Sequence, residues 1–501
     1  MIIDNLPDEV LLEIFDLYRQ TFGDQPSSER VWNNKNGWFK LAHVCHNWRS
    51  VVLASPSRLR LRLYFASNTP TRAAAPERLS HLPIIVDYSN VIWKASAQKR
   101  LISALRYPDR VCRIAIRGSY DYDVSDKITE LVAEALDLPF PALESLELYN
   151  ITSIKRVFLS TSLMTSIQSL RHLRLDGMPL TSLSPLLSVT RSLVDLALSI
   201  DRVFSAEGPS LLTHLQHMPH LRNLRVSSNY CLPDDKPPTT SILLPELTSF
   251  RFVGECTPAG WFVAGLDAPS LREFHISVTD YSRRLHIPYL TKFIRAMGIV
   301  FVAARLTISG PSLRTDLFAW PHRIDDQPSK IFTVKTQFAA DPGSELSAML
   351  TTVEDIFLSS PVFMIPSLSY EDPVTWRKFF EEFRNVKILR LLHGLEMQVA
   401  EILRQPAVNA PPPQEAGPDA TTPSGTPIFA NRSQFIFPSL EEIVLYAGTP
   451  DRSTIGETER ASMLKSFGPF VTARDEVGLP VKVFWSTDGE LPRYFMTDSW
   501  Y

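Results

Sequence analysis

The chain has 501 residues, of which 44% are hydrophobic and 21% charged, with a formal net charge of -3 at pH 7. This length predicts several domains or one long repeat array rather than a single core. The composition excludes a disordered chain, and the small net charge excludes a general attraction to nucleic acid or to a membrane surface.

The first predicted element is an amphipathic helix that begins at Pro7. Proline suits the first helical position, and the acidic Asp8 and Glu9 suit the positive end of the helix dipole. Apolar residues then recur at spacings of three and four, which is the pattern of one helix face. They are Val10, Leu11, Ile14, Phe15 and Leu17.

A second helix is predicted over residues 38–54. Its apolar residues also recur at spacings of three and four: Leu41, Val44, Cys45, Trp48, Val51 and Val52. Ser55-Pro56 ends it, because a residue that precedes proline disfavours the helical conformation. The polar and irregular sequence of residues 21–37 predicts a loop between the two helices.

These residues resemble an F-box. The resemblance rests on Leu6-Pro7, on Glu9-Val10, on Ile14-Phe15 and on the block LAHVCHNWRSVV at residues 41–52. It places an F-box in residues 1–56, although the loop before Trp38 is longer than in short members of that family. It implies a three-helix module that docks on the Skp-type adaptor of a cullin ubiquitin ligase. The residues expected to contact the adaptor are Leu6, Pro7, Val10, Ile14, Val44, Cys45, Trp48 and Arg49.

Two other interpretations of this segment remain open. On periodicity alone, the two helices could form an ordinary helical cap. His43, Cys45 and His46 could also ligate zinc, but no second pair of ligands is spaced to complete a tetrahedral site. We therefore expect no metal and no cofactor.

Strand patterns begin after Pro56. Leu59, Leu61, Leu63 and Phe65 alternate with other residues, which predicts a strand, and residues 82–89 predict the next one. A motif of the form apolar-x-x-apolar-x-apolar then recurs, as far as Ala303, at intervals between 23 residues (Leu170 to Leu193) and 32 residues (Leu271 to Ala303), and at longer intervals after Ala303. The first residues of its copies are Val111, Leu143, Leu170, Leu193, Leu221, Leu247, Leu271, Ala303, Val353, Val386 and Leu440.

This motif and period are typical of leucine-rich repeats, although the usual Asn or Cys after the last leucine is missing. They predict an α/β leucine-rich-repeat solenoid, curved, with parallel strands on the concave face and helices such as residues 98–108 and 128–139 between strands. The solenoid would take residues 111–501, and residues 57–110 would connect it to the F-box. A closed βαβ sheet is the competing fold, but it rarely has a dozen strands.

Several features modify this array. The phrases FPALESLEL, LPELTSFRF, APSLREFHI and FPSLEEIVL carry a proline that rigidifies the turn before the strand. Residues 331–338 predict one more strand, and residues 405–427, rich in Pro, Ala and Thr, predict a disordered insertion. A last strand and an aromatic tail that includes Phe484 and Trp485 predict a C-terminal cap, with an aromatic ligand site as the alternative.

The residue between the last two apolar positions of each motif is expected on the concave face, because strand side chains alternate. This position holds Arg174, Arg225, Arg251 and His275. Arginine forks suit carboxylates and phosphates, so these residues predict a face that binds an acidic or phosphorylated segment of an unknown target protein. Local pairing is the alternative, because Asp176, Asp195 and Glu273 flank these positions.

The sequence contains no phosphate-binding glycine loop, zinc-protease motif or serine-hydrolase motif, so we expect no enzyme activity. The whole layout resembles that of fungal F-box proteins with irregular leucine-rich repeats. It implies a substrate-recognition subunit of a cullin-type (SCF) ubiquitin ligase that binds the Skp-type adaptor and, through it, a cullin. The alternative is a leucine-rich-repeat scaffold that acts without a cullin.

The remaining expectations concern location. No signal peptide is expected, because Asp4, Asp8 and Glu9 interrupt the first apolar residues. The longest apolar run, residues 296–304, is shorter than the roughly 20 residues of a membrane helix. The four cysteines are scattered, which favours reduced thiols. We therefore expect a cytoplasmic or nuclear protein without nucleic-acid or membrane partners.

Overall fold

The computed structural model describes most of the chain. The described residues are 6–21, 38–66, 75–88, 95–117, 132, 134–149, 161–177, 180–200, 211–228, 241–278, 289–296, 301, 303–309, 312–319, 330–337, 350–359, 377, 380–392, 395–404, 435–446 and 457–486. Most of the loop predicted before Trp38, the insertion predicted at 405–427 and the aromatic tail after Ser486 lie outside these residues.

The chain forms two compact units. The first consists of residues 1–227 and 242–247, and the second consists of residues 228–241 and 248–501. The boundaries predicted from the sequence for the F-box, the connector and the solenoid stay predictions. None of the helices in the described part of the chain is long and apolar enough to cross a membrane.

In its described residues, the first unit begins with α1 (Asp8–Thr21), α3 (Trp38–Ala42) and α4 (His46–Ala54). The single helix predicted over residues 38–54 is therefore wrong, because a turn separates α3 from α4. Cys45 causes this break: its backbone is extended, and its Sγ accepts a hydrogen bond from the backbone N–H of Trp48 at 3.4 Å. Cys45 thus caps α4 in the way that a serine often does.

The rest of the first unit is a parallel sheet whose neighbouring strands follow chain order, as predicted. Its strands are β1 (Leu63–Ala66), β2 (Ile84–Tyr88), β3 (Val111–Arg117), β4 (Ser145–Tyr149), β5 (His172–Asp176), β6 (Asp195–Ser199) and β7 (Asn223–Ser228). The short β8 (Ile242–Leu243) follows them in the chain and is not part of this sheet. β1 begins later than the alternation predicted, since Arg60, at a φ of 49°, lies in the preceding turn.

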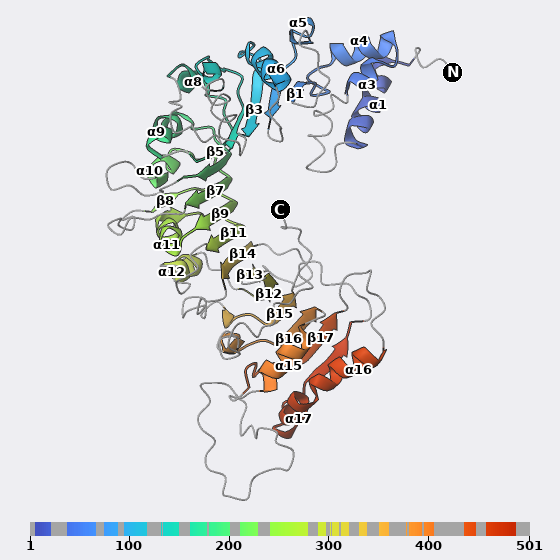
Figure 1. Cartoon of the computed structure of the whole chain (residues 1–501), viewed down its shortest axis with the longest axis vertical. Coiled ribbons are helices and arrows are strands. Elements are labelled where there is room, and N and C mark those ends of the chain that lie inside the picture. The colour runs from blue at the N-terminus through green and yellow to red at the C-terminus, as the bar shows by residue number, and fades with distance from the viewer. Residues whose placement is uncertain are drawn as a thin grey trace, which may run out of the picture. The chain divides into compact units, whose positions relative to one another are not determined.

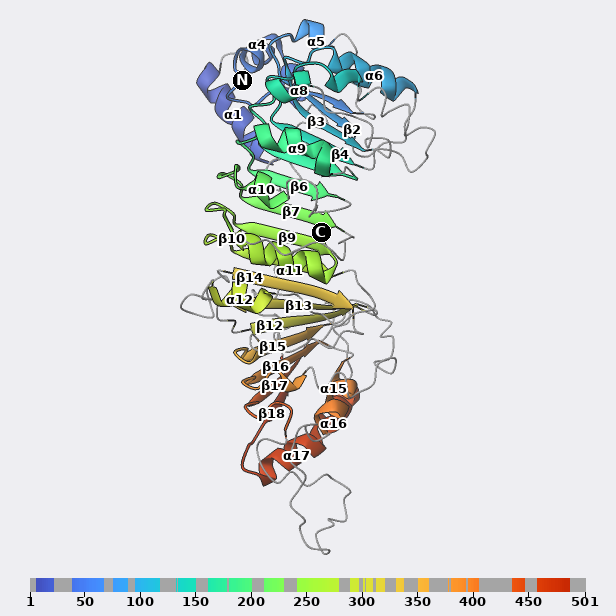
Figure 2. The same ribbon diagram turned by 90° about the vertical axis from the view of Figure 1, so that its left-hand side faces the viewer.

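Helices cover one face of this sheet. They are α5 (Ala75–Arg78), α6 (Ala95–Leu105), α8 (Thr161–Ser166), α9 (Leu180–Val189) and α10 (Leu211–Leu215). α6 packs on β1 and β2, and α9 packs between α8 and α10 along one side of the strands (Figure 1, Figure 2). The motif leucines, such as Leu173, Leu196 and Leu224, are buried, whereas the alternate residues of β5, β6 and β7 are exposed or half-buried.

A tight turn precedes most strands, and its first and last residues are buried. The N–H of its fourth residue donates to the carbonyl of its first residue at 3.1–3.2 Å, for example from Leu143 to Phe140. The other copies of this turn run from residue 167 to 170, 218 to 221, 244 to 247, 268 to 271, 350 to 353 and 437 to 440. Proline occupies the second position in five of the seven, at 141, 219, 245, 269 and 438, which is where a type I or II turn favours it.

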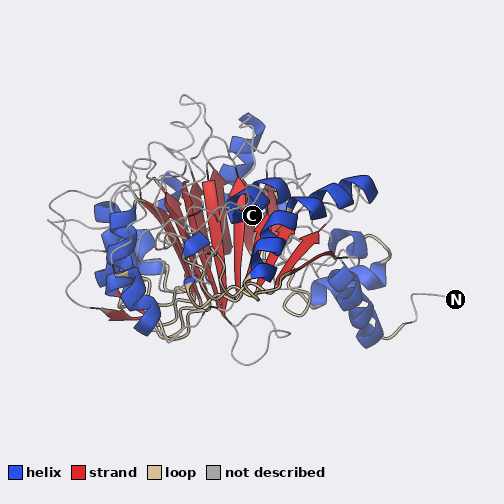
Figure 3. Cartoon of the chain, turned by 90° about the horizontal axis from the view of Figure 1, so that it is seen from below, coloured by secondary structure: helices blue, strands red, loops and turns tan. Residues whose placement is uncertain are grey.

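The turns are also bonded to one another from repeat to repeat. The N–H of Arg171 donates to the carbonyl of Glu144 at 2.9 Å, Val194 donates to Arg171 at 2.8 Å, and Arg222 donates to Val194 at 2.8 Å. The described turns gather at the end of the strands where each strand begins (Figure 3). This hydrogen-bond ladder supplies order that the missing consensus Asn or Cys would otherwise provide.

Arginines hold one of these turns and a similar turn before β2, the first arginine buried and the second half-buried. Arg474 is 1% exposed and donates to the carbonyl oxygens of Phe437 and Leu440, both at 2.8 Å. In the same way Arg110 donates to the carbonyl oxygens of Leu79 and Leu82, both at 2.7 Å, next to β2. Each guanidinium thus saturates backbone oxygens that burial would otherwise leave costly.

The second unit is also built on a sheet, but its strand order departs from chain order. Its strands are β9 (Ser249–Gly254), β10 (Leu266–Asp267), β11 (Glu273–Val278), β12 (Ala303–Ser309), β13 (Ser312–Ala319), β14 (Lys330–Gln337), β15 (Asp355–Ser359), β16 (Ile388–Leu392), β17 (Glu442–Tyr446) and β18 (Lys482–Trp485). In the sheet, the order is β9-β11-β14-β13-β12-β15-β16-β17-β18.

The prediction of an all-parallel array is therefore wrong at one place. β14, the strand predicted from residue 331, is present, but β13 was not predicted and runs antiparallel to both β12 and β14. Only Gly310 and Pro311 separate β12 from β13, which is too short for a parallel crossover. A two-residue connection favours a hairpin, and Gly-Pro is a turn signal that the sequence offered.

Helices and aromatic side chains fill the second unit. Its helices are α11 (Cys256–Gly265), α12 (Leu290–Ala296), α15 (Glu396–Arg404), α16 (Glu457–Ser466) and α17 (Gly468–Glu476). Where the first unit has leucines, β9 and β11 carry Phe250, Phe252 and Phe274, whose rings pack against Phe262 of α11 and Phe293 of α12 at centroid distances of 5.4–5.9 Å. The larger rings fill the space between strands and helices.

The turn before β5 offers a test of the role of proline in these turns. Its second and third residues are Gln168 and Ser169, whereas five of the other six turns have proline at the second position. Gln168→Pro should raise the free energy of unfolding by about 0.4–1 kcal/mol, since proline preorganises that position. Ser169→Pro is the matched control and should destabilise, because it forces Gln168 out of the helical region. Urea unfolding followed by circular dichroism measures both. Equal effects of the two prolines would contradict the turn assignment.

Candidate protein-binding surfaces

The first candidate surface is an apolar stripe on α1 formed by Val10, Ile14 and Leu17. These side chains are 43%, 36% and 62% exposed, respectively, and their spacing of four and three places them on one side of the helix. Val44, in the turn between α3 and α4, is 52% exposed. A packed helical module normally buries such residues, so these four form an exposed apolar surface that is a candidate for protein binding.

A neighbouring side of α1 holds the module together. Leu11 and Phe15 are fully buried, and the Phe15 ring meets the Trp48 ring edge-on at a centroid distance of 4.9 Å. Trp38 is also fully buried, and its ring N–H donates to the carbonyl of Arg62 at 3.1 Å. The helices are therefore fixed by one set of apolar residues while another set stays exposed.

The structure places the predicted adaptor contacts in two groups. Pro7, Val10, Ile14, Val44 and Arg49 are exposed, and the remaining three, Leu6, Cys45 and Trp48, are half-buried. Cys45 caps α4, and Trp48 packs on Phe15. Arg49 closes the turn between the helices, because its Nε donates to the carbonyl of Ala42 at 2.9 Å. Adaptor contact by all eight stays a prediction.

The second candidate surface is the open face, which we define as the side of the β1–β7 sheet opposite its helices. Parallel register arranges its side chains in rows across the strands. One row contains Arg113, Ser145, His172, Asp195 and Asn223, and the next contains Asp87, Ala115, Glu147, Arg174, Ala197 and Arg225. Neighbours in a row are one strand spacing apart, about 4.8 Å.

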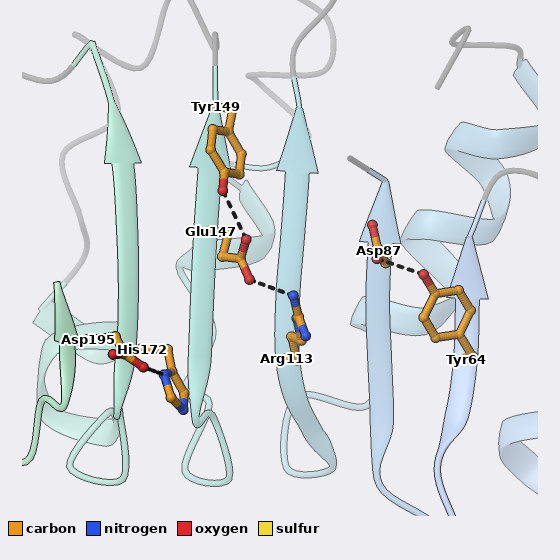
Figure 4. Close-up of polar contacts among 7 residues, drawn as sticks. All are labelled: Tyr64, Asp87, Arg113, Glu147, Tyr149, His172 and Asp195. Carbon is orange, nitrogen blue, oxygen red and sulfur yellow. Dashed lines mark hydrogen bonds and ion pairs between the residues drawn. The ribbon is translucent and has the colours of Figure 1, made fainter. Parts of the chain in front are cut away.

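Polar contacts join these rows (Figure 4). The Tyr64 hydroxyl donates to Asp87 Oδ2 at 2.6 Å. Glu147 accepts from Arg113 Nη2 at 2.6 Å and from the Tyr149 hydroxyl at 3.1 Å. Burial, followed by the charge of Glu147, raises the pKa of Tyr149 to about 12, so this hydroxyl stays protonated and keeps donating at neutral pH.

Asp195 is held by two neighbours in its row. His172 Nδ1 and Asn223 Nδ2 both hydrogen-bond to its carboxylate, the first from β5 and the second from β7. Partial burial alone would raise the pKa of Asp195, but these two hydrogen bonds and the charge of Arg225 outweigh it and lower the pKa below its usual value of 3.8. Asp195 is therefore a charged carboxylate whose hydrogen-bond partners come from the neighbouring strands of the sheet.

The four predicted target-binding residues do lie on alternating positions, as predicted, but in different surroundings. The Arg174 guanidinium lies 4.4 Å from the centroid of the Tyr149 ring, and both Arg174 and Arg225 are exposed. Neither forms an ion pair with a carboxylate of a described residue. In the second unit, Arg251 and His275 are half-buried and paired in register on β9 and β11.

The corresponding side of the sheet in the second unit includes buried positions, as the open face does at Tyr64, Ile85 and Ala115. Phe357, Val444 and Tyr446 are 2–4% exposed there, so apolar residues occupy this side as well. Arg390 Nε donates to both carboxylate oxygens of Asp355 at 2.9 Å, and its Nη1 donates to the Tyr446 hydroxyl at 2.9 Å. This partly buried ion pair, with its additional bond to Tyr446, acts as a structural element of the sheet.

Sequence reasoning missed several members of the open-face network. It took only the position between the last two motif leucines, so it overlooked Tyr64, Asp87, Arg113, His172 and Asn223. The same alternation rule, extended two residues towards the start of each strand, would have found Arg113, His172 and Asn223. Tyr64 and Asp87 lie on the two strands that precede the recognisable motif.

Comparisons with known proteins add little to this description. No family model matches the sequence, and no curated protein matches it. Among solved structures, the leucine-rich repeat-containing protein LegL7 from Legionella pneumophila aligns with 81% of this chain and 97% of its own, at 11% identity and a TM-score of 0.25. A similarity this low carries no argument, so the fold rests on the strand pairings described above.

The lowered pKa of Asp195 predicts a pH-dependent contribution to stability. A carboxyl with a lowered pKa in the folded state stabilises above its unfolded-state pKa of about 3.9, and this contribution disappears as the pH falls through the folded-state value. Asp195→Asn should therefore lower the free energy of unfolding at pH 7, and the difference from the natural chain should shrink below about pH 4.

Asp176→Asn is the matched control. It removes a carboxylate from the same face that has no ion pair with a described residue. Unfolding curves between pH 3 and pH 7 compare the two variants. If both variants showed the same pH profile, the assignment of His172 and Asn223 as partners of Asp195 would be wrong.

Proposed function

We propose that this chain is a substrate-recognition subunit of a cullin-type ubiquitin ligase. In this proposal the module of α1, α3 and α4 is an F-box that docks on a Skp-type adaptor, and the repeat sheet binds a target protein. Other subunits perform the ubiquitin transfer, so the chain contributes binding surfaces and no catalytic group. It acts in the cytoplasm or the nucleus.

The observation that carries the proposal is the apolar stripe on α1. Val10, Ile14 and Leu17 expose apolar side chains on successive turns of one helix, while Leu11 and Phe15 already satisfy the packing of the module. Burying one such side chain in an interface contributes about 1.5–3 kcal/mol, which gives a partner reason to cover the stripe. The F-box motif in the same segment indicates that this partner is the adaptor.

The open face supports the second half of the proposal. Its exposed polar residues are fixed by strands and not by loops, so a partner meets side chains that are already ordered. Repeat sheets present such faces to proteins along their length. We infer that the target binds at β5, β6 and β7, where the alternate residues are exposed or half-buried.

The adaptor assignment is tested with substitutions on the stripe. Ile14→Asp and Leu17→Asp should each weaken binding to a purified Skp-type adaptor by at least about 10-fold, because a lost apolar burial of roughly 1.5 kcal/mol corresponds to that factor. Both side chains are exposed, so the melting temperature should stay unchanged. Isothermal titration calorimetry on the full chain measures the affinity.

Ser50→Asp is the control, because it adds the same charge to an exposed position of α4. Trp48→Ala is less informative, since it also removes the ring contact with Phe15. Equal binding by the Ile14 variant and the natural chain would exclude the stripe as the docking surface. Co-purification then separates the two functions: a substrate receptor brings down adaptor and cullin together, whereas a scaffold brings down the adaptor alone.

A further inference from the structure

We propose that the open face at β5, β6 and β7 binds an extended acidic segment whose two carboxylates lie three residues apart, one held by Arg174 and one by Arg225. This inference rests on the proposed function only in assigning the target to the open face. It specifies the chemistry of the segment, which the proposed function leaves open.

The first argument is the availability of the two arginines. Both are exposed, and neither forms an ion pair with a carboxylate of a described residue. Arg174 rests on the Tyr149 ring, and the neighbouring Glu147 is bonded to Arg113 and Tyr149. Other charged groups of this sheet are already engaged: Arg113 with Glu147, and Asp195 with His172 and Asn223.

The second argument is the shape of the surface between them. Ala197 lies between Arg174 and Arg225 in the same row, and the next row places Ser199 and Ser227 on β6 and β7. These three small side chains form a low floor with a long side chain on either side. A segment can therefore cross β5–β7 along the row without displacing any bulky residue.

The third argument is a match of two distances. Arg174 and Arg225 are two strand spacings apart, which is about 9.4–9.8 Å. In a polyproline II segment, residues three apart point in the same direction and are about 9.3 Å apart. Two acidic residues at that spacing thus reach both arginines. A single phosphate group suits the geometry less well, because Arg174 and Arg225 lie on opposite sides of Ala197, on strands that are not neighbours.

Asp176 places a negative charge beside the row of Arg174 and Arg225. It lies on β5 two residues after Arg174 on the same face, and it has no ion pair with a described residue. A carboxylate there repels an acidic segment that shifts towards the ends of the strands. It therefore favours the row of Arg174 and Arg225 as the position of the bound segment.

The experiment uses the full chain and a rhodamine-labelled peptide, Gly-Pro-Asp-Pro-Pro-Asp-Pro-Gly, in a fluorescence anisotropy titration at low salt. Arg174→Gln and Arg225→Gln should each weaken binding about 2–5-fold, the effect of one exposed ion pair, and the double variant about 5–25-fold. Asp176→Asn should strengthen binding. Arg191→Gln is the matched control, because it removes an exposed arginine from the turn before β6 and should change nothing.

Peptide variants complete the test. Replacing both Asp residues of the peptide by Asn should abolish binding, and moving them next to each other should weaken it. Equal binding of the Asp and Asn peptides would overturn the proposal, and so would an equal loss in the Arg191 control. Tighter binding of a peptide with one phosphoserine would replace the two-carboxylate assignment. The adaptor is absent from this assay, so its result is independent of adaptor docking by α1.

Discussion

Both sheets depend on the buried turn that precedes most of their strands. Its first and fourth residues are apolar and buried, one backbone hydrogen bond closes it, and a further bond joins it to the turn of the neighbouring repeat. These bonds fix where each strand starts relative to its neighbour. The starting points set the register, and the register decides which side chains lie side by side on the sheet. Where the turn needs additional support, an arginine supplies it: Arg474 donates to two carbonyl oxygens of the Phe437–Leu440 turn.

Register then decides which side chains can serve a partner. The motif leucines pack on the helical side of the sheet. The alternate residues of β5, β6 and β7 are exposed or half-buried, and all except Ala197 are polar. In the second unit the same positions include Phe357, Val444 and Tyr446, which are buried, so that sheet is stabilised from both sides. Buried residues also occupy this face in the first unit, at Tyr64, Ile85 and Ala115, so the accessible part of the open face is centred on β5, β6 and β7.

The sequence predicted the strands well because each one is encoded locally, by three apolar residues and a turn. Leu170, Leu173 and Leu175, for example, are all buried where the motif placed them. It failed where a short local signal overrides the period. β13 runs antiparallel to β12 although the repeat predicts parallel strands, and Cys45 interrupts the helix that the spacing of apolar residues favours. The open-face network was only partly predictable, because partners such as His172 and Asp195 lie 23 residues apart and meet only through the register.

In-register parallel strands impose an electrostatic constraint on any exposed face. Each row brings side chains from different repeats to within about 5 Å, so like charges in adjacent repeats destabilise the sheet. The first unit meets this constraint by alternating partners along its rows, with Arg113 beside Glu147 and Asp195 between His172 and Asn223. Arg174 and Arg225 escape mutual repulsion in a different way, because the uncharged Ala197 separates them. Most charges on this face are paired within the sheet, whereas Arg174 and Arg225 have no ion pair with a described residue. The sheet therefore lacks the stabilisation of two ion pairs, and a bound acidic ligand would supply them.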